Sequence, residues 1–331
     1  MLVNVMRFLG SILLFFLCLT SISHSNEEFN KWLTSYKLYA IDKGISKKTV
    51  DEAFKNTKLL SRIISYDRNQ PEFIEKTNVY INKRVNNQKV IYAKKLIRNN
   101  SDLLTKVEKK FKVPKNYLVA LWGIETVFGK HKGKVNTISA LATLSYDKRR
   151  SKYFSRELIT LLKLIDKKIL NLKDLKGSWA GAHGNFQFMP SSIKNYALDY
   201  NKDGKIDLYT SLEDSFASAA NYLKKIGWDE NPWGVKVKLN TKLNTKLNAE
   251  YFTYDARNLS EQKRVKDWIK IGIILPENFS VNRNTKARLV KPDGKVSEVY
   301  MVFNNYEKLL NWNRSLRFAI TIGVFADLLN V

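Results

Sequence analysis

The stretch VPKNYLVALWGIETVFG, residues 113–129, decides how the rest of this chain is interpreted. Pro114 suits the first turn of a helix and Gly129 suits the position just after its end, so one helix is predicted between them. Its apolar face repeats every three or four residues and carries Leu118, Leu121 and Trp122. Glu125 continues the same spacing, so the pattern places a carboxyl group among apolar side chains.

Glu125 is therefore a candidate general acid. A carboxylate in apolar surroundings is unfavourable unless it is protonated or paired. The last turn of a helix also disfavours a negative charge, because the helix dipole is negative there. Both effects raise the pKa of a carboxyl group toward neutral pH, where a general acid works. The alternative is a structural glutamate that is paired with an arginine or with backbone groups.

Helical spacing dominates on both sides of this stretch. Residues 26–110 predict an N-terminal helical region, in which the segment near 72–98 is expected to be one long helix. Residues 111–231 predict a helical core, which ends with a helix from about Glu213 to Ile226. Most of the chain is thus expected to be helical.

The pattern changes over residues 232–303. Alternation with lysines predicts a strand that carries Val235, Val237 and Leu239. Residues 286–291 and 295–303 flank a Pro-Asp-Gly turn and are expected to form a hairpin. The tract from Leu239 to Asn248 repeats Leu-Asn-Thr-Lys, as a local duplication in a loop or an edge strand would. These features predict a small β-containing domain.

Two further helices are expected near the C-terminus. Ser260 is placed to cap a short helix that Gly272 closes. Residues 304–331 predict a last helix, over about 305–329, that returns to the core. The predicted fold class is mainly α (α+β), with a helical core, an N-terminal helical region and a small β-containing insertion.

Residues 1–25 have the pattern of an export signal. Arg7 precedes an apolar run from Phe8 to Ile22, which is shorter than the ~20 residues of a membrane span. We therefore expect a cleaved signal peptide and a periplasmic protein; the alternative is an uncleaved anchor. Cys18, the only cysteine, lies in this run, so disulfides and thiolate sites are excluded from the exported part.

The formal charge of +26 predicts a polyanionic partner. Nucleic acid is not expected, because the protein is predicted to be exported and its basic residues are scattered lysines. A cell wall or an anionic membrane surface is the alternative partner, unless the charge reflects only a lysine-rich composition. Two histidines remain after the signal, His131 and His183, which argues against a zinc site or a Ser-His-Asp triad.

Several motifs follow one another in a recognisable order. They are Gly123–Thr126 with Phe128-Gly129, Ala140–Leu144 with Arg149-Arg150, Gly177–Ala182, Gln187–Ser191, Asn221–Leu223 and Gly227-Trp228, with Gln70–Phe73 upstream and Trp312–Ser315 downstream. This series resembles the lytic murein transglycosylase B family (glycoside hydrolase family 103). The resemblance spans nearly all of the chain after the signal and is strongest over residues 113–228.

The resemblance implies a lysozyme-like catalytic core and cleavage of the MurNAc–GlcNAc bond of peptidoglycan without water. Glu125 matches the family's single catalytic acid, which would act as acid and then as base to form a 1,6-anhydro sugar. No catalytic cofactor is implied. Two alternatives remain: a hydrolytic muramidase, and a non-catalytic wall-binding scaffold. Asp147 and Glu157, the nearest other acids, are expected to be surface charges.

The same resemblance supplies candidate substrate-binding residues. Ser178 and Gln187 match positions that contact the catalytic glutamate and the sugar N-acetyl groups. The candidate cleft residues are Arg149, Arg150, Tyr153, Tyr80, Tyr222 and Asn313. The chain departs from the family pattern in four ways. His183 replaces a methionine, Asn185 enters just before Phe186, and Trp312 and Phe318 replace tyrosines. Glycan strands are the implied partner, and a monomer is expected.

The loop from Asp199 to Asp207 follows the EF-hand pattern D-x-N-x-D-G-x-I-D. Position 12 is Thr210 rather than glutamate, so a later acid would have to complete the site. The expected ligands over residues 199–214 are Asp199, Asn201, Asp203, Lys205 and Asp214, with Glu213 as the alternative last acid. Such a site would hold a structural Ca²⁺; the alternative is a turn rich in Asp and Asn without an ion.

Overall fold

The computed structural model describes residues 26–69, 75–240, 248–294 and 297–330. The expected signal peptide, the motif at residues 70–73 and most of the Leu-Asn-Thr-Lys tract lie outside the described residues. Two compact units share the chain, and their segments alternate along the sequence. The first contains the residues up to Arg68, Gly133–His183 and Phe188–Lys194; the second contains Asn69–Lys132, Gly184–Gln187 and the chain from Asn195 onward.

The first unit is a helical bundle with one short strand pair. Residues 26–42 are helical, and the other helices are α2 (Lys47–Phe54), α3 (Ser61–Arg68), α9 (Thr137–Tyr146) and α10 (Ser151–Asp166). β1 (Val135–Asn136) pairs antiparallel with β2 (Lys176–Gly177), which follows the 3₁₀ turn η1 (Leu172–Asp174). α9 is buried along nearly its whole length, and α3 and α10 pack against it.

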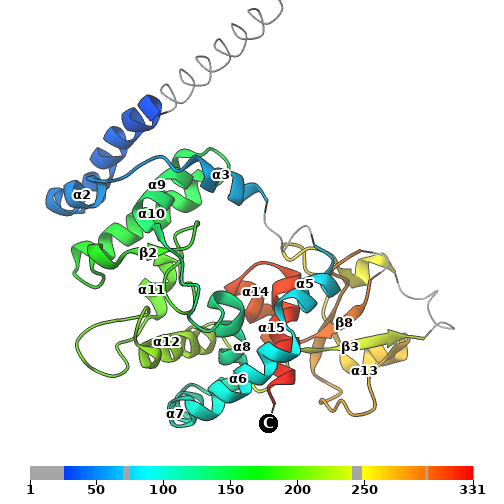
Figure 1. Cartoon of the computed structure of the whole chain (residues 1–331). Coiled ribbons are helices and arrows are strands. Elements are labelled where there is room, and N and C mark those ends of the chain that lie inside the picture. Colours follow the sequence, from blue (N-terminus) through cyan, green and yellow to red (C-terminus); the bar gives the residue numbers. More distant parts are fainter. Residues whose placement is uncertain (1–25, 70–74, 241–247, 295–296, 331) are drawn as a thin grey trace, which may run out of the picture. The chain divides into compact units, whose positions relative to one another are not determined.

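The helices of the second unit gather around α8 (Lys115–Thr126), as Figure 1 shows. The helices that contact α8 are α6 (Asn87–Asn99), α7 (Ser101–Phe111), α12 (Leu212–Lys225) and α15 (Leu316–Leu328). α5 (Thr77–Arg84) and α14 (Asn304–Trp312) pack in turn against α15. Burial on several sides explains why α8 carries apolar residues around its circumference rather than on one face. The short helix α11 (Pro190–Tyr196) precedes the 199–207 loop.

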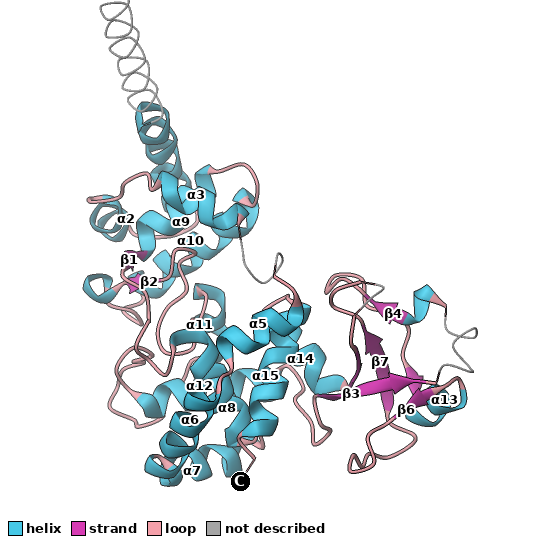
Figure 2. Ribbon diagram, turned by 45° about the vertical axis from the view of Figure 1, so that its right-hand side comes forward, coloured by secondary structure: helices cyan, strands magenta, loops and turns pink. Residues whose placement is uncertain are grey.

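The β part of the second unit has a core of its own. Its strand order is β4-β7-β8-β3-β6, with β5 paired to β7. The strands are β3 (Gly234–Leu239), β4 (Phe252–Thr253), β5 (Lys263–Arg264), β6 (Ile273–Ile274), β7 (Lys286–Val290) and β8 (Val299–Val302). Among the described strands of this sheet, β4 and β7 pair in parallel and the other pairs are antiparallel. Trp268, on α13 (Val265–Lys270), belongs to one buried apolar cluster with Leu289 and Met301. Figure 2 shows α13 beside β6 of this sheet.

The expected strand at 234–239 and the hairpin of β7 and β8 are confirmed, as is the helix from about Glu213 to Ile226. The long helix near 72–98 is wrong, because two helices occupy the described part of this segment. Val85 is extended (φ −127°), and the Asn86 side chain accepts a hydrogen bond from the backbone N–H of Lys89. An N-cap of this kind begins a new helix, so α6 starts a separate element.

The terminal helix is also two helices rather than one. α14 ends where Asn313 is extended, and Ser315 begins α15 by accepting a hydrogen bond from the backbone N–H of Phe318 (3.3 Å). Ser260 does not cap α13, which starts at Val265 after Arg264. The Ser260 hydroxyl lies instead 2.9 Å from that of Thr253. Apolar spacing alone does not reveal breaks and caps of this size.

The mainly α class with a small β insertion is confirmed. Within the part of the chain that the structure describes, there is no helix of sufficient length and apolar character to cross a bilayer.

Candidate active site

Glu125 lies in the last turn of α8 and is half-buried. The chain leaves this helix through three consecutive residues with positive φ: Val127 (52°), Phe128 (58°) and Gly129 (80°). Two of them carry a β-carbon, for which this conformation is unfavourable, and such strain is typical of functional sites. Residue 123, two positions before Glu125, is a glycine. A β-carbon there would lie 2.7 Å from the Phe128 ring.

The end of α8 is held by Thr126 and Asn185. The Thr126 hydroxyl donates to the Asn185 carbonyl (2.8 Å) and accepts from the backbone N–H of Gly129 (3.0 Å). The Asn185 side-chain oxygen accepts from the indole N–H of Trp122 (3.1 Å), and its amide donates to Ser215 (3.1 Å). Asn185 is buried, so these bonds fix the backbone around Glu125.

Trp312 reaches the candidate acid from α14. Its indole N–H donates a hydrogen bond to Glu125 Oε1 (2.9 Å) across a separation of 187 residues. The Trp312 ring stacks on Tyr222, whose ring stacks on Tyr196. The family resemblance placed Trp312 in a motif but did not predict its contact with Glu125.

Gln187 and Tyr222 lie in the same unit as Glu125. Gln187 has a φ of 50°, and its side-chain amide donates to the carbonyls of Gly184 (2.9 Å) and Lys132 (3.2 Å). These bonds hold a tight turn at residues 184–187. The Tyr222 hydroxyl donates to the carbonyl of Asn311 (3.0 Å), which holds the end of α14 near the stacked rings. Asn313 follows α14 directly and is half-buried.

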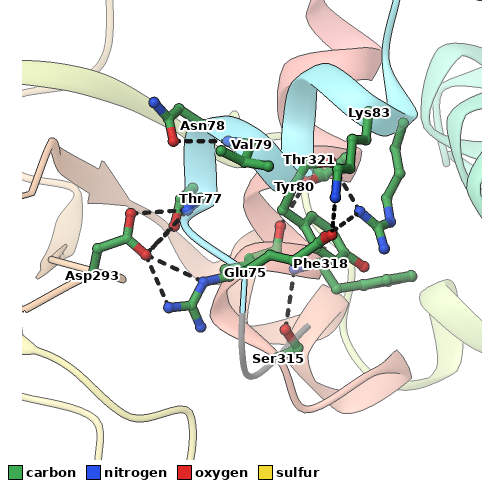
Figure 3. Close-up of polar contacts among 12 residues, drawn as sticks. Glu75, Thr77, Asn78, Val79, Tyr80, Lys83, Asp293, Ser315, Phe318 and Thr321 are labelled. Atoms are coloured by element: carbon green, nitrogen blue, oxygen red, sulfur yellow. Dashed lines mark hydrogen bonds and ion pairs between the residues drawn. The ribbon is translucent and has the colours of Figure 1, made fainter. Parts of the chain in front are cut away.

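Tyr80, expected as an aromatic wall, is 4% exposed. The Arg84 guanidinium lies 3.5 Å from the centre of its ring, and Glu75 binds both Arg84 (2.8 Å) and Lys83 (2.5 Å). Figure 3 shows Glu75 directed toward Lys83 near the Tyr80 ring. Most of the ring is therefore covered by the protein itself. Its role in sugar binding stays a prediction.

Ser178 belongs to the first unit, where it organises a glycine-rich turn. Its hydroxyl accepts hydrogen bonds from the backbone N–H groups of Ala180 (3.2 Å) and Ala182 (3.0 Å). Gly181 has a φ of 83°, and a β-carbon there would lie 2.6 Å from Leu141. His183, the departure from the family pattern, is buried and hydrogen-bonds through Nδ1 to the Lys176 carbonyl (3.1 Å).

Arg149 and Arg150 have an anionic partner within the first unit. Both guanidinium groups bind the carboxylate of Asp67, and Arg149 Nε lies 2.6 Å from its Oδ2. The Asp67 side chain is 1% exposed, whereas those of Arg149 and Arg150 are 42% and 36% exposed. Asp67 could not be singled out from the sequence, because a lone acid carries no local signal of burial.

Tyr153 is partly exposed beside this cluster. Burial of its hydroxyl, with a smaller contribution from the charge of Glu157, raises the pKa of Tyr153 to about 12, so the group stays neutral. The expectation that Glu157 is a surface charge is wrong. Glu157 is buried and accepts hydrogen bonds from the backbone N–H (2.9 Å) and hydroxyl (2.7 Å) of Ser191, at the start of α11. Asp147 is not an open surface charge either, because its side chain is 12% exposed and binds Arg68 (2.9 Å).

The 199–207 loop is held by its own acids. Asp199 accepts hydrogen bonds from the backbone N–H groups of Asp203 (3.1 Å) and Gly204 (2.9 Å). Asp214 is buried and accepts from Tyr200 (2.7 Å) and Asp207 (2.9 Å), so it joins the two ends of the loop. Among the described residues, no group of three His, Cys, Asp or Glu side chains is arranged to hold a metal ion.

The candidate residues thus fall into two groups. Arg149, Arg150, Tyr153 and Ser178 lie in the first unit, and Glu125, Gln187, Tyr222, Asn313 and Tyr80 lie in the second. A hydrogen bond and a ring stack bring Glu125, Trp312 and Tyr222 together. A half-buried carboxyl group fixed on a rigid helix and hydrogen-bonded by an indole can transfer a proton to and from a bound substrate.

Comparisons with known proteins found similar sequences and similar structures. A family model described as a transglycosylase SLT domain matches residues 28–327. Membrane-bound lytic murein transglycosylase B of Escherichia coli (strain K12) is 44% identical over 128 residues, which cover 38% of this chain and 35% of the relative. The chain thus matches about a third of that relative's length.

Two solved structures extend the similarity to most of the fold. SltB3 from Pseudomonas aeruginosa, in complex with NAG-anhNAM-pentapeptide, is 30% identical with a TM-score of 0.78, covering 90% of this chain and 78% of that one. Slt35 from Escherichia coli, in complex with calcium, is 26% identical with a TM-score of 0.74, covering 90% of this chain and 92% of that one. The expected lysozyme-like class is confirmed by these similarities.

Proposed function

Because the chain belongs to the transglycosylase SLT domain family, we propose that it is a lytic transglycosylase that cleaves the MurNAc–GlcNAc β-1,4 bond of peptidoglycan. The product is a 1,6-anhydro-MurNAc end. The observation that carries the proposal is Glu125, a half-buried carboxyl group on a rigid helix end within the family's motif. SltB3, which was solved with peptidoglycan fragments, supports the substrate class.

Glu125 acts twice in the proposed reaction. Its protonated carboxyl group donates a proton to the glycosidic oxygen, and the bond from that oxygen to C1 of MurNAc breaks. The 6-hydroxyl oxygen of the same MurNAc then attacks C1, and its proton passes to the Glu125 carboxylate. The acid is thereby restored and no water is consumed. A second catalytic carboxylate, as in ordinary glycosidases, is not required, because the substrate supplies the nucleophile.

The other candidates take roles in substrate binding. Ser178 and Gln187 contact the N-acetyl groups and the region of the acid, and Tyr153, Tyr80, Tyr222 and Asn313 contact the sugars. Arg149 and Arg150 bind a lactyl or peptide carboxylate. Since two guanidinium groups share the single charge of Asp67, the cluster keeps a net positive charge for such a ligand.

The oligomeric state, cellular location and partners of the enzyme are proposed from the sequence. It is proposed to be a monomer in the periplasm after removal of residues 1–25, with no nucleic-acid partner. The positive charge favours contact with the wall or with an anionic membrane surface. The Escherichia coli relative is named as membrane-bound.

A structural Ca²⁺ at the 199–214 loop is also proposed. The donors are all oxygens, which suits this ion: the side chains of Asp199, Asn201 and Asp203 and the carbonyl of Lys205. Asp214 contributes as the last acid, although its oxygens already accept backbone hydrogen bonds that hold the loop. The calcium complex of Slt35 supports the proposal. Catalysis itself requires no cofactor.

The decisive experiment is digestion of purified sacculi by residues 26–331, followed by mass spectrometry of the released muropeptides. A lytic transglycosylase releases anhydro ends, which are one water lighter than reducing ends. Reducing ends in their place would identify a hydrolytic muramidase. Binding to sacculi without release of any product would identify a wall-binding scaffold.

A further inference from the structure

The indole of Trp312 is held on two sides. The Trp312 and Tyr222 rings are stacked with centroids 4.8 Å apart and planes inclined by 24°, and the Tyr222 and Tyr196 rings stack at 4.3 Å and 13°. The Phe186 ring meets the indole at 70°, with the two centroids 6.2 Å apart. A ring packed in this way has little rotational freedom, so its N–H has a defined direction.

That N–H is directed at Glu125 Oε1, at 2.9 Å. An indole nitrogen is a donor only, whereas a tyrosine hydroxyl both donates and accepts. A donor stabilises the ionised carboxylate more strongly than the neutral acid, because hydrogen bonds to charged groups are the stronger ones. Trp312 can therefore bind a carboxylate oxygen but cannot accept the acid's proton.

We infer that Trp312 is a positioning residue for Glu125. Its indole orients the carboxyl group and favours the carboxylate that receives the proton of the attacking hydroxyl. This inference rests on the proposed function for its kinetic consequences, while the hydrogen bond itself can be tested without any activity.

Charged groups on the helices around α8 mostly have other partners. Arg317 on α15 binds Asp293 (2.9 Å), Asp327 on the same helix accepts from Trp233 (2.9 Å), and Glu108 on α7 accepts from the backbone N–H of Lys115 (3.1 Å). On α12, Glu213 is exposed, and Asp214 accepts a hydrogen bond from Tyr200 in the 199–214 loop. The basic residues of its last turn are Lys224 and Lys225.

Lys89 on α6 is the group to separate from Glu125 in a pH experiment. Its ammonium group lies 5.9 Å from the centre of the Phe128 ring. Burial, with a smaller contribution from the charge of Arg84, lowers the pKa of Lys89 to about 8. Its titration would overlap the alkaline limb of an activity profile, so Lys89→Met is included as a control.

The first test is a titration that does not depend on catalysis. The protein is labelled with ¹⁵N at its seven tryptophans, and the Trp312 indole signal is assigned by its absence from Trp312→Phe. We expect this signal to shift with pH in the wild type and in Lys89→Met, and to stay constant in Glu125→Gln. A Trp312 signal that is constant in the wild type, or that titrates equally in Glu125→Gln, would overturn the inference.

The second test measures kcat and KM on a soluble GlcNAc–MurNAc oligosaccharide. Trp312→Phe should lower kcat by about tenfold or more, the range of a hydrogen bond to a charged group, and leave KM within about threefold. Its alkaline limb should move to higher pH, because the acid form is retained longer once the donor is lost. A loss in KM alone, or an unmoved limb, would contradict a positioning role.

A replacement at Trp312 and a control at Trp228 distinguish the effect of the indole N–H from the effect of ring packing. Trp312→3-benzothienylalanine keeps the bicyclic shape and replaces N–H by sulfur, so it should reproduce the kcat loss and limb shift of Trp312→Phe. Full activity in this variant would assign the effect to packing and overturn the inference. Trp228→Phe is the matched control, because the described residues offer the Trp228 N–H no hydrogen-bond acceptor. It should leave kcat and the limb unchanged.

Discussion

Glu125 sits where two local features meet. The last turn of α8 gives its carboxyl group a rigid base, and the left-handed residues that follow turn the chain sharply away from it. Phe128, the second of these residues, is buried and packs edge-on against the Trp122 ring. The acid therefore depends on the backbone around it for its position and on Trp312 for its orientation.

Glu125→Gln tests the chemical role of this residue. The substitution keeps the volume and an acceptor oxygen for Trp312, so the protein should fold and melt close to the wild type. An amide cannot donate and recover a proton at a useful rate, so release of anhydro-muropeptides from sacculi should fall by ~10²–10⁴-fold or more. Activity within about tenfold of the wild type would remove the acid–base role from Glu125.

Asp67 presents a second question at this scale, because a buried carboxylate holds two arginines. Asp67→Asn leaves Arg149 and Arg150 without their anion and should lower the unfolding free energy by ~1–3 kcal/mol. This expected loss of unfolding free energy is smaller than for a fully buried ion pair, because both arginines remain in contact with water. Chemical denaturation measures the change.

Asp147→Asn is the matched control for Asp67→Asn. It breaks the ion pair with Arg68, in which the Asp147 side chain is 12% exposed and that of Arg68 53% exposed. Because the charge has one arginine partner in contact with water, the cost should be smaller, ~0–1 kcal/mol. Equal losses in the two variants would show that the burial of Asp67 adds nothing to stability.

At the scale of elements, the turn between β7 and β8 caps a helix that is distant in sequence. α5 has no side-chain cap from its own N-terminus. Asp293 supplies one, because its carboxylate accepts hydrogen bonds from the Thr77 backbone N–H (2.9 Å) and hydroxyl (2.9 Å), as Figure 3 shows. It also accepts one from Arg317 (2.9 Å). One acid thus joins the hairpin, α5 and α15.

Asp293→Ala should lower the unfolding free energy by ~1–3 kcal/mol, because it removes a cap and an ion pair at once. Asp293→Asn should cost less, since asparagine caps a helix about as well as aspartate and only the ion pair with Arg317 is lost. Thermal melting of both variants gives the order. If the asparagine variant is as unstable as the alanine variant, the cap contributes nothing.

The 199–214 loop allows a prediction about ligand-dependent stability. A cation that binds only the folded protein raises the melting temperature as its concentration exceeds Kd. Wild type should melt higher in millimolar Ca²⁺ than in chelator, and Asp199→Ala and Asp203→Ala should lose this difference. Identical wild-type melting curves in Ca²⁺ and chelator would remove the calcium proposal and leave the enzymatic one intact.

At the scale of the whole molecule, regular helices and strands were easier to predict from the sequence than the residues at which they end. α8, the strand at 234–239 and the β7–β8 hairpin have strong local patterns and were predicted. The break between α5 and α6 was missed, because one extended residue and one N-cap interrupt a pattern that otherwise continues. Helix boundaries depend on a few backbone angles, which apolar spacing does not report.

The candidate site shows the same division. Glu125 could be singled out because its helical spacing, its place in the last turn and its motif are all local features. Asp67 and Glu157 could not, since an acid that will be buried against distant arginines or a distant helix end looks like a surface charge in the sequence. Trp312 could be identified in the sequence as a departure from the family pattern, but its hydrogen bond to Glu125 could not be predicted.

The sequence by itself determined the mainly α class, the position of the acid and the family, because spacing, caps and ordered motifs act over short distances along the chain. Only the tertiary structure decided which groups meet the acid: Trp312 donates to Glu125 across 187 residues, and Asp293 caps α5 across 216. Such pairs form when packing brings distant segments together, and each partner alone carries no trace of the other.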